Sequence, residues 1–469
     1  MPAPLIFIVT PLLVAPCVYA MRRWPIASAL TAAGTAALLG LAALLIPLNA
    51  ASGWITNSFT VLGRTFVAEP GNRLILTLIF FQAAILFAGA GLQRLERYFL
   101  TAGLAALGVL SAALFVRPFL YAAIFLELVA ALAVFMLGDS AHLGGEPRPA
   151  TRGALRFLVY TTLALPLILF TGWFLDQSLG SPDEARYLQF ATYSLAMGFA
   201  ILLAVVPFHG WLPMAAEHSP PLASAFVASV FQFTAVAMIL NTLNAYTWLA
   251  QNPQVYRWFT LAGMGMVAVG ALLAFGQRNL GRVMGYALMI DTGAVLLALG
   301  LGTRAGAEVV LSTLVLRGLA LPLWGLGLDC LRRAAPGGGN DFDALQGLAV
   351  RYPLAAAAII IGLLSLVGFP LTAGFPARWA LLRLLAETNI LAALALVLAM
   401  VSVGLVCARG LVTLNTPWVE AETVTLGEGR VLGGVLSLGL VLMLLWGAFP
   451  QWLLPLITGG AQSVAGLSP

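Results

Sequence analysis

The chain has 469 residues, of which 61% are hydrophobic and only 9% are charged. Soluble domains carry about 25% charged residues, so this composition excludes a water-soluble globular protein and indicates a chain surrounded mostly by lipid. All 23 basic side chains, within a formal net charge of +5, are arginine, because the sequence contains no lysine.

Long runs of Leu, Ala, Val and Gly recur along the chain, without the alternation of strands. A helix needs about 20 apolar residues to cross the hydrocarbon core, and backbone exposed to lipid must form a helix or a closed barrel. We therefore predict a single transmembrane domain, 1–469, that is all-α and polytopic. About 14 transmembrane helices are expected, over residues 4–21, 26–48, 72–92, 98–115, 118–138, 155–176, 187–207, 219–243, 257–276, 282–302, 307–331, 353–386, 389–411 and 431–457.

The first apolar run is expected to remain as a span, because Arg22 and Arg23 follow it, whereas a secretory signal begins with basic residues. Cytoplasmic loops of membrane proteins carry an excess of arginine and lysine. If both termini lie on the outer side, the arginines on the cytoplasmic side are Arg22, Arg23, Arg94, Arg97, Arg148, Arg152, Arg156, Arg278, Arg282, Arg332, Arg333, Arg351, Arg409 and Arg430. We predict this orientation, in a bacterial cytoplasmic (inner) membrane.

Two of the predicted helices, the seventh and the twelfth, contain helix breakers. The stretch 205–225, "VVPFHGWLPMAAEHSPPLASA", and the stretch 367–382, "VGFPLTAGFPARWALL", each carry prolines, which cannot donate a backbone hydrogen bond and which kink a helix. Broken helices at membrane depth are tolerated where they line a polar cavity. Paired breaks are typical of transporters built from internal repeats. We therefore expect two inverted repeats, 98–243 (helices 4–8) and 257–411 (helices 9–13).

Four motifs carry a resemblance to a known family. "PFHGWLPMAAEHSPPLASA" (207–225) resembles its P-F-H-x-W-L-P signature, and "RNLGRVMGYALMIDTG" (278–293) resembles its D-x-K-R-x-x-A-Y-S-S motif. "LRGLALPLWGLG" (316–327) and "GFPLTAGFPAR" (368–378) are similar to its F-K-A-x-L-F and G-x-P-x-x-x-G-F-x-x-K motifs. The family is that of the antiporter-like membrane subunits of complex I (NADH:quinone oxidoreductase), membrane-bound hydrogenases and multisubunit cation/proton antiporters.

This resemblance implies a membrane subunit of a proton-translocating complex I-type oxidoreductase that contributes to ion translocation. Its expected partners are the lipid bilayer and other membrane subunits of a complex I-type or hydrogenase-type assembly. Because ionisable side chains in the bilayer are costly, each is a functional hypothesis. The candidates for proton-relay or electrostatic roles are Glu127, Arg378, Arg317, Asp291, His209 and Gln232.

The two acidic candidates lie in the fifth and tenth predicted helices. Glu127 matches the family's buried glutamate, which implies a proton-carrying or gating carboxylate; the alternative is a structural acid bonded to serine or water. Asp291 occupies a place where the family often has Gln or His. It can act as a relay, or it can pair with Arg317 or Arg378.

The two arginines stand where the family carries titratable residues. Arg317 matches a lysine, and Arg378 matches a lysine or glutamate at the exit-side proton site. A guanidinium has a pKa above about 12 and hardly ever releases its proton, so both are expected to act as fixed charges. For Arg378 the alternative is a helix-end arginine that snorkels to the interface.

His209 belongs to the first motif, where it either transfers protons or hydrogen-bonds the broken backbone. Gln232 is the polar group of the eighth helix that stands where the family has His or Lys. The family's seventh-helix lysine falls at 201–203, which is apolar. Two interpretations therefore remain beside a free-standing transporter: a conducting subunit, or a degenerate structural subunit that has lost its key lysines.

No redox or cofactor site is expected. Cys17, Cys330 and Cys407 have neither metal-binding nor redox spacing, and no glycine-rich nucleotide turn is present. We expect no cofactor, no metal, no nucleic acid and no small-molecule substrate bound by this chain. Whether it counts as an enzyme depends on redox partner subunits.

Overall fold

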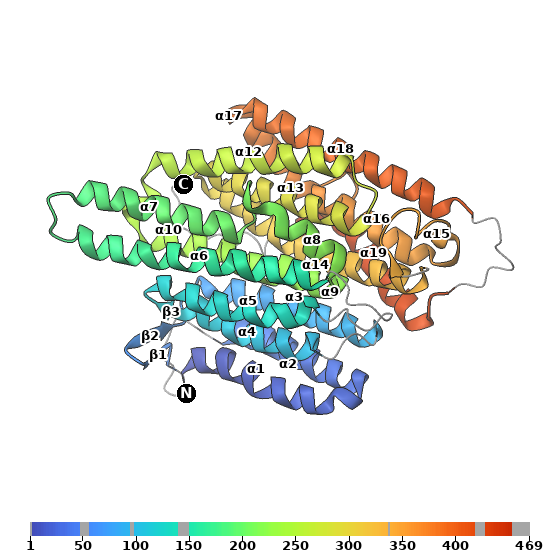
Figure 1. The fold of residues 1–469 in the computed structure, drawn as a ribbon, viewed down its shortest axis with the longest axis horizontal. Helices are drawn as coiled ribbons and strands as arrows, with labels where there is room; N and C mark the ends of the chain where they lie inside the picture. The colour runs from blue at the N-terminus through green and yellow to red at the C-terminus, as the bar shows by residue number, and fades with distance from the viewer. Residues whose placement is uncertain are drawn as a thin grey trace.

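The computed structural model describes residues 2–46, 56–93, 98–138, 150–335, 338–417 and 427–452. The predicted positions of both termini, and those of Arg94, Arg97 and Arg148, lie outside these residues. The helices run side by side along the long axis of the molecule (Figure 1). They are α1 (Ala3–Ala20), α2 (Pro25–Leu45), α3 (Asn72–Gln93), α4 (Phe99–Phe115), α5 (Ala122–Gly138), α6 (Ala150–Ser178), α7 (Glu184–Leu202), α8 (Trp211–His218), α9 (Pro221–Phe226), α10 (Gln232–Ala245), α11 (Thr247–Ala250), α12 (Pro253–Phe275), α13 (Leu280–Gly300), α14 (Arg304–Ala334), α15 (Leu348–Arg351), α16 (Pro353–Val367), α17 (Phe375–Thr388), α18 (Ile390–Asn415) and α19 (Arg430–Ala448).

Many helices of the described chain are able to span a membrane. In that part, 11 helices are long and apolar enough to cross a membrane, and two shorter apolar helices are Phe99–Phe115 and Pro353–Val367. The chain is therefore a multi-pass, helical membrane protein, while the count of fourteen spans stays a prediction.

The helices differ in how much of their surface the protein itself covers. The span Pro221–Ala245, which joins α9 and α10 through a π-helical segment (Val227–Phe231), is the most enclosed, and α13 and α14 follow it closely. Helices α6 and α19 bury only a small share of their residues. Helices α1 and α2 lie at one edge of the molecule and α12, α17 and α18 at the other (Figure 1). Buried polar side chains on α10, α13 and α14 are therefore held far from lipid.

Helix starts in the second half are set by capping side chains. Asn252, Asn279, Thr303 and Asn389 each accept a hydrogen bond from a backbone N–H in the first turn of α12, α13, α14 and α18. Such caps satisfy one of the four N–H groups that a helix start leaves free. These sequence-local signals fix where the helices around the site begin.

A small antiparallel sheet accompanies the predicted helices. Strands β1 (Ser58–Val61), β2 (Arg64–Val67) and β3 (Val116–Arg117) pair in the order β1–β2–β3. Leu62 and Gly63 both have positive φ, 50° and 72°, as a two-residue hairpin of type I′ requires. The stacked rings of Phe59 and Phe66, with centroids 4.9 Å apart, hold the register. The short segment is rich in aromatic and β-branched residues, which favour strands.

The chain leaves helical geometry in two segments that matter for function. Helix α7 ends at Leu202 and α8 begins at Trp211, with a 3-10 turn, Phe208–Gly210, between them. Helix α16 ends at Val367, Gly368 has a φ of 80°, and α17 begins at Phe375. We call these segments, 203–210 and 368–374, the first and second interruptions.

Candidate functional site: a buried cluster of one carboxylate and two arginines

Asp291 lies between two arginines in the interior of the second half. Its Oδ2 accepts a hydrogen bond of 2.6 Å from Arg317 Nε, and its Oδ1 accepts one of 2.7 Å from Arg378 Nη2. The three side chains are only 1–3% exposed. They come from three helices, α13, α14 and α17, so the tertiary fold brings together residues separated by as many as 87 positions.

Polar neighbours complete the surroundings of Arg317. Its Nη1 donates to Gln232 Oε1 at 3.0 Å, and its Nη2 donates to Thr292 Oγ1 at 3.0 Å. Nη1 also lies 3.4 Å from the carbonyl oxygen of Ala228, in the π-helical segment. A wider helical turn of this kind is frequent at functional sites. Gln232 thus belongs to the cluster and serves as an acceptor for a guanidinium.

Arg378 is tied to the second interruption itself. Its Nη2 donates to the carbonyl oxygen of Leu366 at 3.0 Å. In a continuous helix that carbonyl would accept from the N–H four residues later, but that residue is Pro370, which has none. Arg378 therefore supplies the donor that the proline removes. It is 3% exposed and does not snorkel to an interface.

The formal charges of the cluster do not cancel. Two arginines and one aspartate leave one positive charge in excess in the protein interior. Within the described part of the chain, Nε and Nη1 of Arg378 have no hydrogen-bond acceptor. A guanidinium keeps its proton, so the cluster holds a permanent positive field with one carboxylate at its centre.

Glu127 lies outside this cluster. Its Oε1 accepts a hydrogen bond of 2.5 Å from Thr162 Oγ1, which connects α5 to α6. Thr162 is exposed and Glu127 is half-buried, among the exposed apolar side chains of Ile124, Leu128 and Leu163. Its second oxygen, Oε2, has no donor among the described residues, and no hydrogen bond or ion pair there links it to Asp291. The partner is thus a threonine, and the half-buried carboxylate lies where α5 meets α6, with Oε2 buried.

His209 also lies apart from the cluster. It is half-buried in the 3-10 turn of the first interruption, and its Nδ1 has no hydrogen-bond partner among the residues described. The two alternatives for its role, proton transfer and support of the backbone, both remain predictions.

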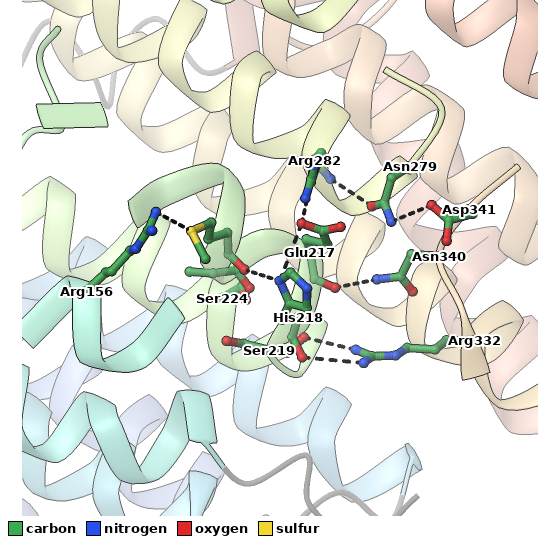
Figure 2. Close-up of polar contacts among 12 residues, drawn as sticks. Arg156, Glu217, His218, Ser219, Ser224, Asn279, Arg282, Arg332, Asn340 and Asp341 are labelled. Carbon is green, nitrogen blue, oxygen red and sulfur yellow. Dashed lines mark hydrogen bonds and ion pairs between the residues drawn. The ribbon is translucent and has the colours of Figure 1, made fainter. Parts of the chain in front are cut away.

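The polar residues beyond the first interruption hold the link between α8 and α9, as Figure 2 shows. Arg332 donates to the carbonyl oxygens of Ser219 at 3.1 Å and His218 at 3.4 Å. Asn340 Nδ2 donates to the carbonyl oxygen of Glu217 at 2.7 Å. The carbonyls at the end of α8 are satisfied in this way.

The side chain of Glu217 also points into the protein. It forms an ion pair with Arg282, and it is only 14% exposed (Figure 2). Glu217 was not among the candidates that the sequence analysis named. The reason is long-range: α13 packs against α8 and brings Arg282 next to it.

Gln82 is a buried polar residue that the sequence analysis missed. Its Nε2 donates to the carbonyl oxygen of Leu314 at 3.2 Å, one turn before Arg317. A Cβ on Gly318 would lie 2.1 Å from that Nε2, so only glycine permits this approach between α3 and α14. Its amide side chain within the apolar run "LILTLIFFQAAILFAG" was the available signal.

A hollow of about 350 Å³ lies beside the cluster, between one face of α14 and one face of α17. Its polar lining consists of Glu308, Ser312, Arg383 and Glu387. Leu316 and Ala377, the neighbours of Arg317 and Arg378 in the chain, line it as well. We call this hollow the vestibule.

The fold and the cluster together define a multi-pass membrane protein that keeps permanent charges in its interior. The family model described as "NADH:quinone oxidoreductase/Mrp antiporter, TM" matches residues 182–404, which include all members of the cluster. Residues 182–404 therefore belong to this family of antiporter-like membrane subunits, and the chain is similar to its members beyond that range.

Relatives and solved structures agree with this assignment. The chain is 30% identical over 250 residues to the NADH-quinone oxidoreductase subunit N of Acidithiobacillus ferrooxidans, covering 50% of this chain and 51% of the relative. Its fold matches a chain of the Mrp complex of a Dietzia species with a TM-score of 0.80 at 18% identity, covering 99% and 97%. It also matches a chain of respiratory complex I of Thermus thermophilus, with a TM-score of 0.69 at 21% identity, covering 95% and 99%.

The chain spans about half the length of several curated relatives that it matches. The structural likeness, at identities of 18% and 21%, shows the fold.

Proposed function

We propose that the chain is a membrane subunit of a proton-translocating complex I-type oxidoreductase and contributes to ion translocation across a bacterial inner membrane. The observation that carries the proposal is the carboxylate of Asp291, enclosed between Arg317 and Arg378 at the second interruption. Charged side chains inside the membrane are expensive to bury, so a cluster of three indicates a function. Relatives named as NADH-quinone oxidoreductase subunits support the same role.

The two arginines act as fixed charges and do not carry protons. Asp291 is bound to both of them through separate oxygens, so a small shift of α17 against α14 changes which arginine it pairs with more strongly. Each change moves negative charge toward or away from the vestibule, where Glu308 and Glu387 meet solvent. In this proposal, the cluster controls the proton affinity of nearby hydrated groups through its field.

Glu127 serves the first half of the chain and faces a neighbouring subunit. Oε2 of Glu127 is buried without a donor, which is costly, and it lies on a helix whose neighbouring side chains Ile124 and Leu128 are exposed. A partner that covers this face and brings a hydrogen-bond donor removes that cost. We propose that the partner is another membrane subunit of a complex I-type or hydrogenase-type assembly.

We also propose for the chain the membrane topology that its sequence predicts. Both termini lie on the outer side, and residues 98–243 and 257–411 form two inverted repeats. The interruptions then belong to corresponding helices of the two repeats. Redox chemistry is assigned to partner subunits.

The test is the ratio of protons taken up to electrons transferred in inverted membrane vesicles that contain the intact complex. We expect Glu127→Gln to lower this ratio, because glutamine cannot bind or release a proton there, with assembly of the complex intact. Glu184→Gln is the matched control: it removes a carboxylate from the exposed start of α7 and leaves the ratio unchanged. An unchanged ratio in Glu127→Gln would instead assign this chain a structural role in the complex.

A further inference from the structure

A second hollow lies between α7, α10 and α12. It has a volume of about 350 Å³, and no charged side chain lines it among the described residues. Its walls are apolar and partly aromatic, and they include Leu195, Ala200, Ile239, Phe259 and Ala262. We call it the apolar groove.

The apolar groove suits an apolar occupant. An engineered apolar cavity of about 150 Å³ stays free of water and binds benzene, because ordered water needs two to four polar partners. The groove is more than twice as large and offers hardly any such partners. A thin, extended hydrocarbon chain is an occupant that needs no polar partners in such a groove.

The apolar groove continues into a polar hollow. This polar hollow has a volume of about 510 Å³ and shares the residues Thr192 and Trp258 with the apolar groove. Side-chain amides dominate its polar lining, and they come from Gln189, Gln251, Asn252 and Gln254. We call it the amide hollow.

The border between the two hollows has the residues of a membrane–water interface. Trp248 and Trp258 line the amide hollow, and the rings of Trp258 and Tyr193 lie 5.2 Å apart. Tryptophan and tyrosine gather at the level of lipid headgroups, where one end of the ring is apolar and the other is wet. The amide hollow lies at the ends of helices, beside the start of α12 and the short helix α11. One elongated site therefore runs from hydrocarbon depth to headgroup depth.

We propose that this combined site binds a phospholipid, with one acyl chain in the apolar groove and the phosphate and ester region in the amide hollow. Amide N–H₂ groups donate to phosphate and ester oxygens, which are acceptors on every phospholipid. Neither hollow is lined by a charged side chain among the described residues. Recognition therefore depends on hydrogen bonds, and zwitterionic and anionic headgroups bind about equally well. The inference does not depend on the proposed role in ion translocation.

The first experiment maps the acyl chain by cross-linking. The full chain is placed in nanodiscs that contain a phosphatidylethanolamine with a diazirine near the end of one acyl chain, and cross-linked peptides are identified after illumination. We expect peptides covering 192–205 and 255–262 to be labelled well above those of the lipid-facing residues Leu30 and Leu38 on α2. A phosphatidylglycerol probe of the same chain length gives the same pattern.

A filled-groove variant supplies the comparison. Ala200→Phe with Ala262→Phe places two rings in the groove and lowers labelling of both peptides at least fivefold. Ala268→Phe is the matched control, because Ala268 is an exposed alanine on α12 that does not line the groove. Labelling of the groove peptides that equals labelling of α2, or that persists in the filled-groove variant, would overturn the proposal.

A second measurement keeps the test valid if the filled-groove variant fails to fold. Gln251→Ala with Gln254→Ala changes only exposed side chains of the amide hollow. Native mass spectrometry of the detergent-washed chain should show one retained phospholipid in the wild type and at least a threefold lower occupancy in this variant. Retention of a quinone or a free fatty acid, without phospholipid, would contradict the proposal.

Discussion

The two interruptions each contain a proline but hold very different groups. At the second interruption, Arg378 reaches back from α17 to the carbonyl of Leu366 and to Asp291, so permanent charge sits at the break itself. At the first interruption, backbone hydrogen bonds such as Val205 N–H to the carbonyl of Ala200, 2.8 Å, close the turn. The side chains that donate hydrogen bonds to the backbone there contact residues further along the chain, at the end of α8.

The two halves of the chain therefore hold their charged side chains in different surroundings. The second half keeps its charges enclosed by α10, α13, α14 and α17. In the first half, the candidate carboxylate Glu127 is half-buried and is bonded to Thr162, away from this cluster. An interrupted helix by itself therefore does not indicate a buried charge; the neighbouring helices decide whether a charge can be held there.

The largest effect that tests this comparison is expected from Asp291→Asn. The variant leaves two buried arginines without a counter-charge, and removing one partner of a buried ion pair costs about 3–5 kcal/mol. We expect a corresponding loss in the free energy of unfolding of the full chain in nanodiscs, measured by thermal unfolding. Asp343→Asn, an exposed loop carboxylate, is the control and should change little. A fully stable Asp291→Asn variant would show that the arginines are compensated elsewhere.

Arg332→Met tests the ties at the end of α8. Three carbonyl oxygens, those of Ser219, His218 and Gly338, lose a donor. Hydrogen bonds to charged groups contribute about 1.5–3 kcal/mol, so we expect a loss near the upper end of that range in the same unfolding measurement. Arg257→Met removes an exposed arginine of α12 for comparison. Equal effects of the two variants would remove the contrast between a backbone tie and a surface charge.

Arg378→Lys should have a smaller effect. Lysine keeps the positive charge but lacks the planar, forked guanidinium, so it cannot hold Asp291 and the carbonyl of Leu366 with the same geometry. We expect a loss of about 1.5 kcal/mol, the value of one hydrogen bond of a charged donor. The control is Arg383→Lys, on an exposed position of the same helix. A loss as large as that of Asp291→Asn would mean that geometry, more than charge, holds the second interruption.

Glu127→Gln should change stability least of all. The amide oxygen of glutamine can still accept the hydrogen bond of Thr162, and the side chain is only half-buried. We expect a change within about 0.5 kcal/mol, as for most surface substitutions. The same thermal unfolding series measures it. A loss of several kcal/mol would place Glu127 in a buried network and erase the difference between the halves.

Much of the architecture was readable from local patterns. Apolar runs of about 20 residues indicated membrane helices, because lipid leaves the backbone few alternatives. Caps such as Asn279 and Asn389 directly precede the helices that they start. The hairpin at Leu62–Gly63 was also a local feature, but its segment is short and lies in a loop of a chain dominated by helices.

Only part of the site could be predicted from the sequence. The sequence named Asp291, Arg317, Arg378 and Gln232 as candidates and left open which arginine the aspartate pairs with. In the structure it pairs with both. Gln82 and the inward direction of Glu217 were not foreseen, since both depend on helices distant in the sequence.

The sequence by itself determined that this protein is surrounded by lipid, that it is helical, which broad family it resembles and which charged residues are candidates for a function. Those follow from composition, run length and motifs, which are local. Only the tertiary structure decided that three of these charges meet in one enclosed cluster and that Glu127 stays outside it. The physical reason is that a buried charge depends on which helices surround it, and helix packing joins residues that no local pattern connects.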